Sequence, residues 1–259
     1  LFEREQHAAH GLSWFATYVQ AIREMIAYAR RLEDAGALGE IETLLTRIGL
    51  SEYVAQVFGG IPMSQGEMVR PSDFGLTGEQ VAKRRSAAVE NVIASGNTTQ
   101  NRARLADLID HSSASATVGD PGLDETLIAI REEVRKYAES EVTPHAHEWH
   151  LKNEYIPLDV IKGLADLGVF GLTLPEEYGG MGLGKTAMCV VTEELSRAYI
   201  GVGSLGTRSE IAGELILSSG TDEQKAELLP LIASAEILPT AVFTEPNTGS
   251  DLASLRTRA

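Results

Sequence analysis

The spacing of apolar residues in the first part of the chain restricts that region to helices. Between Leu12 and Ala29 apolar side chains recur at intervals of three and four residues, which is the period of one helix face. Gly36 and Gly39 interrupt this pattern. The pattern is suited to a helix bundle, and further helices are predicted over 40–58, 79–94 and 100–109.

The second half of the chain begins after a stretch rich in Ser, Ala and Thr at 111–122, which is the best linker candidate. Helical patterns then resume, and only 237–243 has the character of a buried strand. Thr221 and Gln224 predict a capping box on a helix that Pro230 is expected to close. The fold is therefore predicted to be mainly α, with a helical extension over 1–118, a second helical domain over 119–235 and the start of a β-domain over 236–259.

The charge balance excludes two classes of partner. The chain has 22 Lys and Arg against 37 Asp and Glu, a net charge of −15. Binding to nucleic acid or to an anionic membrane through phosphate contacts needs the opposite sign. No apolar run approaches the ~18 residues of a spanning helix. We therefore expect no nucleic acid, no membrane and a cytoplasmic location, which the single Cys189, expected in the core, also suits.

A glycine-rich segment from Gly179 to Thr186 matches the phosphate-loop pattern G-x-x-x-x-G-K-[S/T]. In a nucleotide hydrolase its N–H groups would cradle phosphates and Lys185 would reach the outer ones. Such a loop must follow a buried strand, whereas an acidic, proline-broken stretch at 174–178 precedes this one. A turn between two helices is favoured, and a P-loop nucleotide-binding protein is the alternative.

Two other groups of polar residues are interpreted as structural. His147 and His150 share a helix face while His145 points elsewhere, and no Cys or acidic residue completes a metal-binding set. No metal site is therefore predicted. The adjacent carboxylates Glu193 and Glu194 face different directions, so we expect surface charges or caps rather than an acid–base pair.

The last landmark is the block T-E-P-N-T-G-S-D at 244–251, which follows the predicted strand. Pro246 makes a rigid turn, and Gly249 lets the main chain approach a ligand closely. Two hydroxyls, of Thr244 and Ser250, and nearby backbone N–H groups would then face a polar ligand lying across the end of the strand.

This block resembles the flavin-contacting signature of acyl-CoA dehydrogenases. Three earlier segments resemble further landmarks of that family in the same order. They are G-V-F-G-L-T-L-P-E-E-Y-G-G-M-G at 168–182, E-E-L at 193–195 and G-T-D-E-Q-K-A-E-L-L-P at 220–230. The resemblance covers roughly 124–259 and implies the family's N-terminal helical domain, followed by the first strand of a truncated middle β-domain.

The resemblance implies an FAD-dependent oxidoreductase that desaturates a short acyl-CoA thioester between its α and β carbons. The family's base is a glutamate in a C-terminal domain, so no catalytic residue is expected here, and this chain alone should be inactive. The chain also begins with Leu1, so residues are expected upstream. The implied partners are an acyl-CoA, an electron-transfer flavoprotein and further copies in a homodimer or homotetramer. The residues implied to contact FAD are Val242, Phe243, Thr244, Gly249 and Ser250, with Ser250 also near the pantetheine arm of the substrate.

Two segments of the N-terminal extension, 10–18 and 58–67, resemble bacterial methylsuccinyl-CoA dehydrogenases. This implies conversion of (2S)-methylsuccinyl-CoA to mesaconyl-CoA. Such a substrate has a free carboxylate whose burial needs a partner, and arginine offers a bidentate one. Arg208, on the segment that resembles the acyl-pocket helix, is the candidate. The alternatives are that Arg208 pairs with Glu210 or faces solvent, and that the chain is a non-catalytic helical interaction module.

Overall fold

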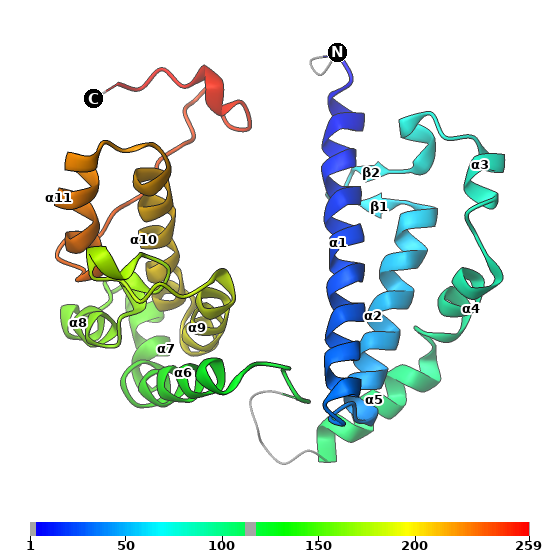
Figure 1. Cartoon of the computed structure of the whole chain (residues 1–259), viewed down its shortest axis with the longest axis horizontal. Coiled ribbons are helices and arrows are strands. Elements are labelled where there is room, and N and C mark those ends of the chain that lie inside the picture. The colour runs from blue at the N-terminus through cyan, green and yellow to red at the C-terminus, as the bar shows by residue number, and fades with distance from the viewer. Residues whose placement is uncertain (1–3, 112–117, 259) are drawn as a thin grey trace. The chain divides into compact units, whose positions relative to one another are not determined.

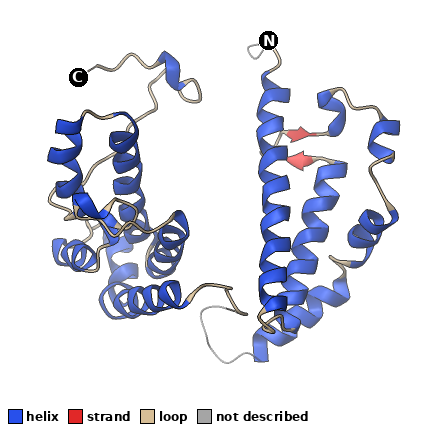
Figure 2. Cartoon of the chain, viewed as in Figure 1, coloured by secondary structure: helices blue, strands red, loops and turns tan. Residues whose placement is uncertain are grey.

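The computed structural model describes residues 4–111 and 118–258. Over these residues the protein is helical apart from one two-stranded sheet, so the prediction of a mainly α fold is confirmed (Figures 1 and 2). The chain divides into two compact units, unit 1 at 1–123 and unit 2 at 124–259, and each is described by itself. The division into three domains stays a prediction, and 112–117 of the predicted linker lie outside the described residues.

Unit 1 is built on two long helices that pack along one another, and a short antiparallel hairpin follows them (Figure 1). The predicted helix over 79–94 is wrong as one element, because the chain leaves the helix after Ala82 and a new helix starts where the Ser86 hydroxyl accepts a hydrogen bond from the Val89 N–H. The predicted helices over 40–58 and 100–109 are confirmed. The elements are α1 (Gln6–Asp34), α2 (Glu40–Gly59), β1 (Ile61–Pro62), β2 (Met68–Val69), η1 (Pro71–Phe74), α3 (Gly78–Ala82), α4 (Ala87–Ser95) and α5 (Thr99–His111).

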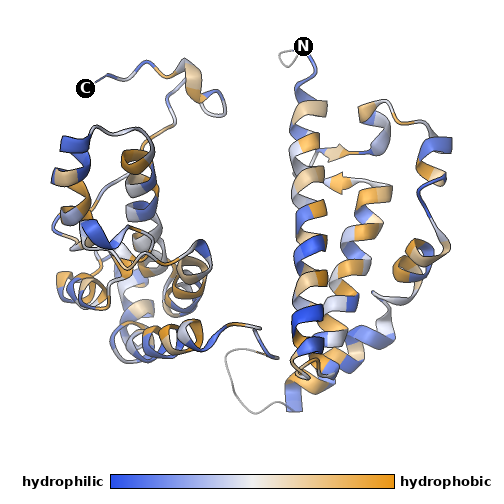
Figure 3. Cartoon of the chain, viewed as in Figure 1, coloured by the Kyte–Doolittle hydropathy of each residue, from blue (hydrophilic) through white to orange (hydrophobic). Residues whose placement is uncertain are grey.

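Only part of the predicted apolar stripe on α1 is packed: Phe15, Ile22 and Ala29 are partly buried, and the Phe15 ring meets that of Phe74 edge-on. Leu12 is 62% exposed, and Val19 and Ile26 are also exposed, although Figure 3 shows the apolar character that recurs along this helix. Gly11 is buried because the hairpin lies close against it: a Cβ at this position would be 2.3 Å from a methyl group of Val69. The hairpin can lie against α1 only where the side chain is absent.

Unit 2 is a compact helical domain whose core includes the fully buried side chain of Phe170. The predicted helices from about 157 to 167 and 186 to 197 are confirmed within a residue or two. The elements are α6 (Glu125–Tyr137), η2 (Ala138–Val142), α7 (Thr143–Lys152), α8 (Leu158–Asp166), η3 (Val169–Gly171), η4 (Glu176–Tyr178), α9 (Lys185–Ala198), α10 (Ile200–Ser219), α11 (Asp222–Ala233) and η5 (Leu252–Ser254).

Three local predictions for unit 2 are wrong. Pro230 lies inside α11, which continues to Ala233; Leu229 and Ile232 beside the proline are buried, and their packing offsets the missing backbone hydrogen bond. Cys189 is exposed on α9 rather than in the core. The segment 237–243 is extended chain without strand pairing, because no other extended segment of the described chain lies beside it, and a strand needs a partner to satisfy its backbone groups.

Candidate functional site

The segment that carries the predicted ligand-binding residues leaves unit 2 from the end of α11. The capping box that starts α11 is confirmed: Thr221 Oγ1 accepts from the Gln224 N–H at 3.2 Å, and Gln224 Oε1 accepts from the Thr221 N–H at 2.9 Å. After the helix, the Ile237 N–H donates to the Leu231 carbonyl at 3.0 Å. The capping box holds the start of α11, and the hydrogen bond from Ile237 holds the chain just after its end, where the segment leaves the helix.

Backbone donors are available along this segment. From Leu238 to Thr244, no N–H group donates a hydrogen bond to another described residue. Nearly all residues of this stretch are exposed, so their N–H groups face solvent. This stretch can therefore offer hydrogen bonds to an extended polar ligand.

The five predicted flavin contacts lie on the exposed chain after α11, three of them in the stretch that ends at Thr244 and two beyond the turn at Pro246. Val242 is 81% exposed, Phe243 is 39% exposed, and Thr244, Gly249 and Ser250 are exposed as well. A Cβ built on Gly249 would meet nothing within 4 Å, so the main chain there is open to a ligand. The structure thus shows that the five residues are accessible, while their roles stay a prediction.

Glu245, between Thr244 and Pro246, holds the far part of the segment in place. Its two carboxylate oxygens accept hydrogen bonds from the N–H groups of Arg256 and Thr257 and from the Thr257 hydroxyl. The hydrogen bonds from the Thr257 hydroxyl and N–H, ahead of the one from Arg256, lower the pKa of Glu245. This glutamate has no role assigned from the sequence, because its hydrogen-bond partners, Arg256 and Thr257, lie beyond the motif at 244–251.

Arg208 lies on α10 and is exposed. No hydrogen bond or ion pair within the described chain joins it to an acidic group, and its guanidinium has only a 3.5 Å contact with the Ser204 hydroxyl. The alternative pairing with Glu210 is wrong, because Glu210 binds Lys185 at 2.8 Å. Arg208 therefore faces solvent, as the second alternative expects, and no contact joins it to the segment after α11.

The phosphate-loop interpretation of 179–186 is not favoured by the geometry. The 3₁₀ turn η4 precedes these glycines, not a strand, and the only sheet in the described chain lies in unit 1. Lys185 Nζ contacts Glu210 at 2.8 Å and Glu214 at 2.5 Å, and the hydrogen bonds to these two carboxylates raise its pKa. A lysine held by two carboxylates is not free to bind phosphate.

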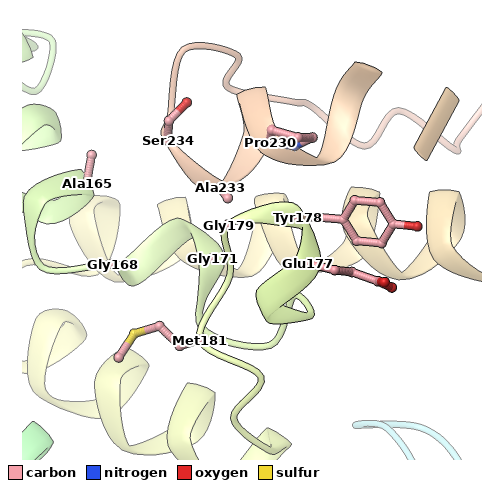
Figure 4. A pocket seen from close by; sticks show the side chains of 10 residues that line it. All are labelled: Ala165, Gly168, Gly171, Glu177, Tyr178, Gly179, Met181, Pro230, Ala233 and Ser234. Atoms are coloured by element: carbon pink, nitrogen blue, oxygen red, sulfur yellow. The ribbon is translucent and has the colours of Figure 1, made fainter. Parts of the chain in front are cut away.

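The glycine-rich landmark instead packs on α11. A Cβ on Gly180 would lie 2.1 Å from the Leu174 carbonyl oxygen, and one on Gly171 would lie 3.2 Å from the Cβ of Ala233. Figure 4 shows the cleft of about 410 Å³ that remains there, with the side chains of Glu177 and Tyr178 pointing away from Ala165 and Met181. The cleft is lined by Ala165, Gly168, Gly171, Glu177, Tyr178, Gly179, Met181, Pro230, Ala233 and Ser234.

The interpretation of Glu194 as a surface charge is wrong. Its side chain is 1% exposed, and Arg135 donates two hydrogen bonds to it, at 2.6 and 2.9 Å. Arg131 and Arg197 each lie 3.3 Å from its oxygens. Burial alone would raise the pKa of Glu194, but the hydrogen bonds from Arg135 and the three positive charges outweigh it and lower the pKa. Sequence reasoning missed this cluster because α6 supplies two of its arginines.

The three histidines at 145–150 do not form a metal site in the described chain. No three His, Cys, Asp or Glu side chains among the described residues lie close enough to hold a metal ion. The His145 ring stacks on Trp149 with 5.7 Å between ring centroids. None of the described helices is both long and apolar enough to cross a membrane.

Comparisons with known proteins place the geometry in context. A family profile described as "Acyl-CoA dehydrogenase, N-terminal domain" matches residues 124–236. The chain is 58% identical over 257 residues to a (2S)-methylsuccinyl-CoA dehydrogenase of Cereibacter sphaeroides. This alignment covers 99% of the present chain and 46% of the relative. It is 38% identical over 152 residues to a mitochondrial isovaleryl-CoA dehydrogenase of Oryza sativa subsp. japonica, covering 58% of this chain and 36% of that one.

A solved glutaryl-CoA dehydrogenase from Mycobacterium smegmatis is 32% identical with a TM-score of 0.49 and covers 52% of this chain and 35% of that one. The chain thus spans less than half the length of each of these relatives.

Proposed function

We propose that this chain is the N-terminal part of an FAD-dependent acyl-CoA dehydrogenase, because residues 124–236 match the profile of that family's N-terminal domain and nearly the whole chain aligns with a (2S)-methylsuccinyl-CoA dehydrogenase. The enzyme would remove hydrogen from adjacent carbons of an acyl-CoA thioester. The observation that carries the proposal is the exposed segment after α11, whose N–H groups from Leu238 to Thr244 have no internal partner. The family's flavin signature falls on that same segment.

FAD fits the residues present there. Val242, Phe243 and Thr244 offer backbone groups and a hydroxyl to the flavin ring, and Gly249 and Ser250 offer an open main chain and a hydroxyl to the pyrophosphate. The cofactor supplies the redox chemistry when bound, by accepting a hydride. The chain's own residues bind and orient it, and Ser250 would also contact the pantetheine arm of the substrate.

The substrate is proposed to be a short acyl-CoA with a terminal carboxylate, of which (2S)-methylsuccinyl-CoA, giving mesaconyl-CoA, is the leading example. The support is the 58% identity to a protein of that name over nearly the whole chain. Arg208 supports it independently, because it is a cation without an acidic partner in the described chain. We propose that Arg208 binds the substrate carboxylate.

The remaining parts of the proposal follow from the family. The catalytic base would be a glutamate outside these 259 residues, so this chain by itself would be inactive. The electron acceptor would be an electron-transfer flavoprotein, the assembly a homodimer or homotetramer, and the location the cytoplasm.

Two measurements on the full-length protein test the proposal. Purified protein should show flavin absorbance and should reduce an artificial electron acceptor with methylsuccinyl-CoA. A colourless protein that cannot be reconstituted with FAD would overturn the flavoenzyme assignment.

The role of Arg208 has its own test. Arg208→Leu should raise KM for methylsuccinyl-CoA by about tenfold or more and leave KM for butyryl-CoA unchanged, since only the first substrate has the carboxylate. Lys162→Leu is the matched control, because Lys162 is also exposed and has no acidic partner in the described chain. Equal effects of Arg208→Leu on both substrates would reject the role.

A further inference from the structure

Glu245 lies between the two parts of the proposed flavin site, and its hydrogen bonds close a loop that runs from 245 to 257. The backbone of Glu245 pairs with that of Thr248: the Glu245 N–H donates to the Thr248 carbonyl at 2.8 Å, and the Thr248 N–H donates back at 3.1 Å. Together these bonds define the tight turn at Pro246 and Asn247. The same residue therefore ends the extended stretch and begins the loop that carries Gly249.

The side chain of Glu245 fastens the other end of this loop. Its oxygens lie 3.0 and 3.1 Å from the Arg256 nitrogen, 2.6 Å from the Thr257 nitrogen and 2.5 Å from the Thr257 hydroxyl. Hydrogen bonds to a charged acceptor are stronger than those between neutral groups. One carboxylate thus joins the chain at 245 to the chain at 256–257.

Gly249 and Ser250 lie within this loop of residues 245–257, and neither makes a hydrogen bond to the rest of the described chain. On the C-terminal side, the nearest backbone hydrogen bonds run from Ser254 and Leu255 back to Asp251 and Leu252. The position of the glycine and serine relative to Thr244 is therefore set by the closure at Glu245, not by contacts of their own.

We propose that Glu245 is a positioning residue for FAD: it fixes the loop that presents Gly249 and Ser250 to the pyrophosphate without touching the cofactor itself. This inference rests on the proposed function. It also explains how an acidic side chain can lie next to a site for a doubly charged anion. The donors of Arg256 and Thr257 occupy its oxygens and so compensate its charge.

The experiment separates loop closure from cofactor binding. Glu245→Ala removes every acceptor of the closure, Thr257→Val removes only the hydroxyl donor, and Thr257→Ser keeps that hydroxyl. Glu227→Ala is the matched control, because Glu227 is exposed on α11 and has no hydrogen-bond partner among the described residues. Amide hydrogen exchange at residues 256 and 257 is measured without FAD in the purified protein, and the Kd for FAD is measured by flavin fluorescence in the apoprotein. Far-UV circular dichroism checks that the helices are intact.

Glu245→Ala should abolish the exchange protection of the two amides and raise the Kd for FAD by about tenfold, as expected for several lost hydrogen bonds. Thr257→Val should give a smaller change of the same sign, and both Thr257→Ser and Glu227→Ala should match the parent protein. Lost protection with an unchanged Kd would overturn the positioning role while leaving the flavin site standing. Unchanged protection would refute the closure itself. If the parent protein binds no FAD, the proposed function fails, while the exchange data still judge the closure.

Discussion

Replacing Glu194 by Gln tests whether its charge holds α6 against α9. The substitution keeps the shape of the side chain and removes the negative charge that faces Arg131, Arg135 and Arg197. Since the side chains of Arg131 and Arg135 are only 15% and 21% exposed, water cannot replace the lost partner fully. Removing one member of a buried ion pair costs about 3–5 kcal/mol, and the partial exposure of the arginines favours the lower end, about 3 kcal/mol.

The assay is urea unfolding followed by the fluorescence of Trp149, which is 8% exposed in the core of unit 2. Trp14 lies in unit 1, so Trp14→Phe in the background protein leaves one reporter. Glu193→Gln is the matched control, because Glu193 is the exposed neighbour on the same helix and should change the unfolding free energy by less than about 0.5 kcal/mol. If Glu194→Gln cost as little as Glu193→Gln, the reasoning would be refuted.

Three further predictions concern unit 2. The folded-state pKa of Glu194 is lowered, so its contribution to stability is fully present above the ordinary glutamate pKa of about 4.3 and is lost as the pH falls through the lowered value. Urea midpoints should therefore drop less steeply with acid in Glu194→Gln than in the parent. Gly180→Ala should destabilise unit 2 by about 3 kcal/mol, since its Cβ would meet a backbone carbonyl, whereas Gly184→Ala has open space and should cost less than about 1 kcal/mol, the effect of placing alanine at the N-cap of α9. Thr221→Ala should cost about 1 kcal/mol through loss of the cap on α11, and Thr221→Ser should restore it.

Periodicity and capping signals predict the helices well, because a helix satisfies its own backbone. The helix predicted over 40–58 ends one residue from the observed α2, and the cap at Thr221 is present as expected. The segment 237–243 fails for the opposite reason. Its apolar residues are suited to a strand, but a strand forms only beside another strand, and no local pattern shows whether one is near.

The candidate site is predictable only where the signal is local. The motif at 244–251 locates the exposed segment, and the resemblance assigns its residues, but the partners of Glu245 lie beyond the motif. The burial of Glu194 likewise depends on α6, far away in the sequence. Pairings across such separations follow from the fold as a whole.

The exposed position of Cys189 has a practical consequence for physical measurements. It is the single thiol in the chain and lies on a rigid helix, so a maleimide reagent should attach once, at a known place in unit 2. With a second thiol introduced at an exposed site of α1, paired nitroxide labels would report the distribution of distances between the two units by pulsed electron spin resonance. No native cysteine would have to be removed for this measurement.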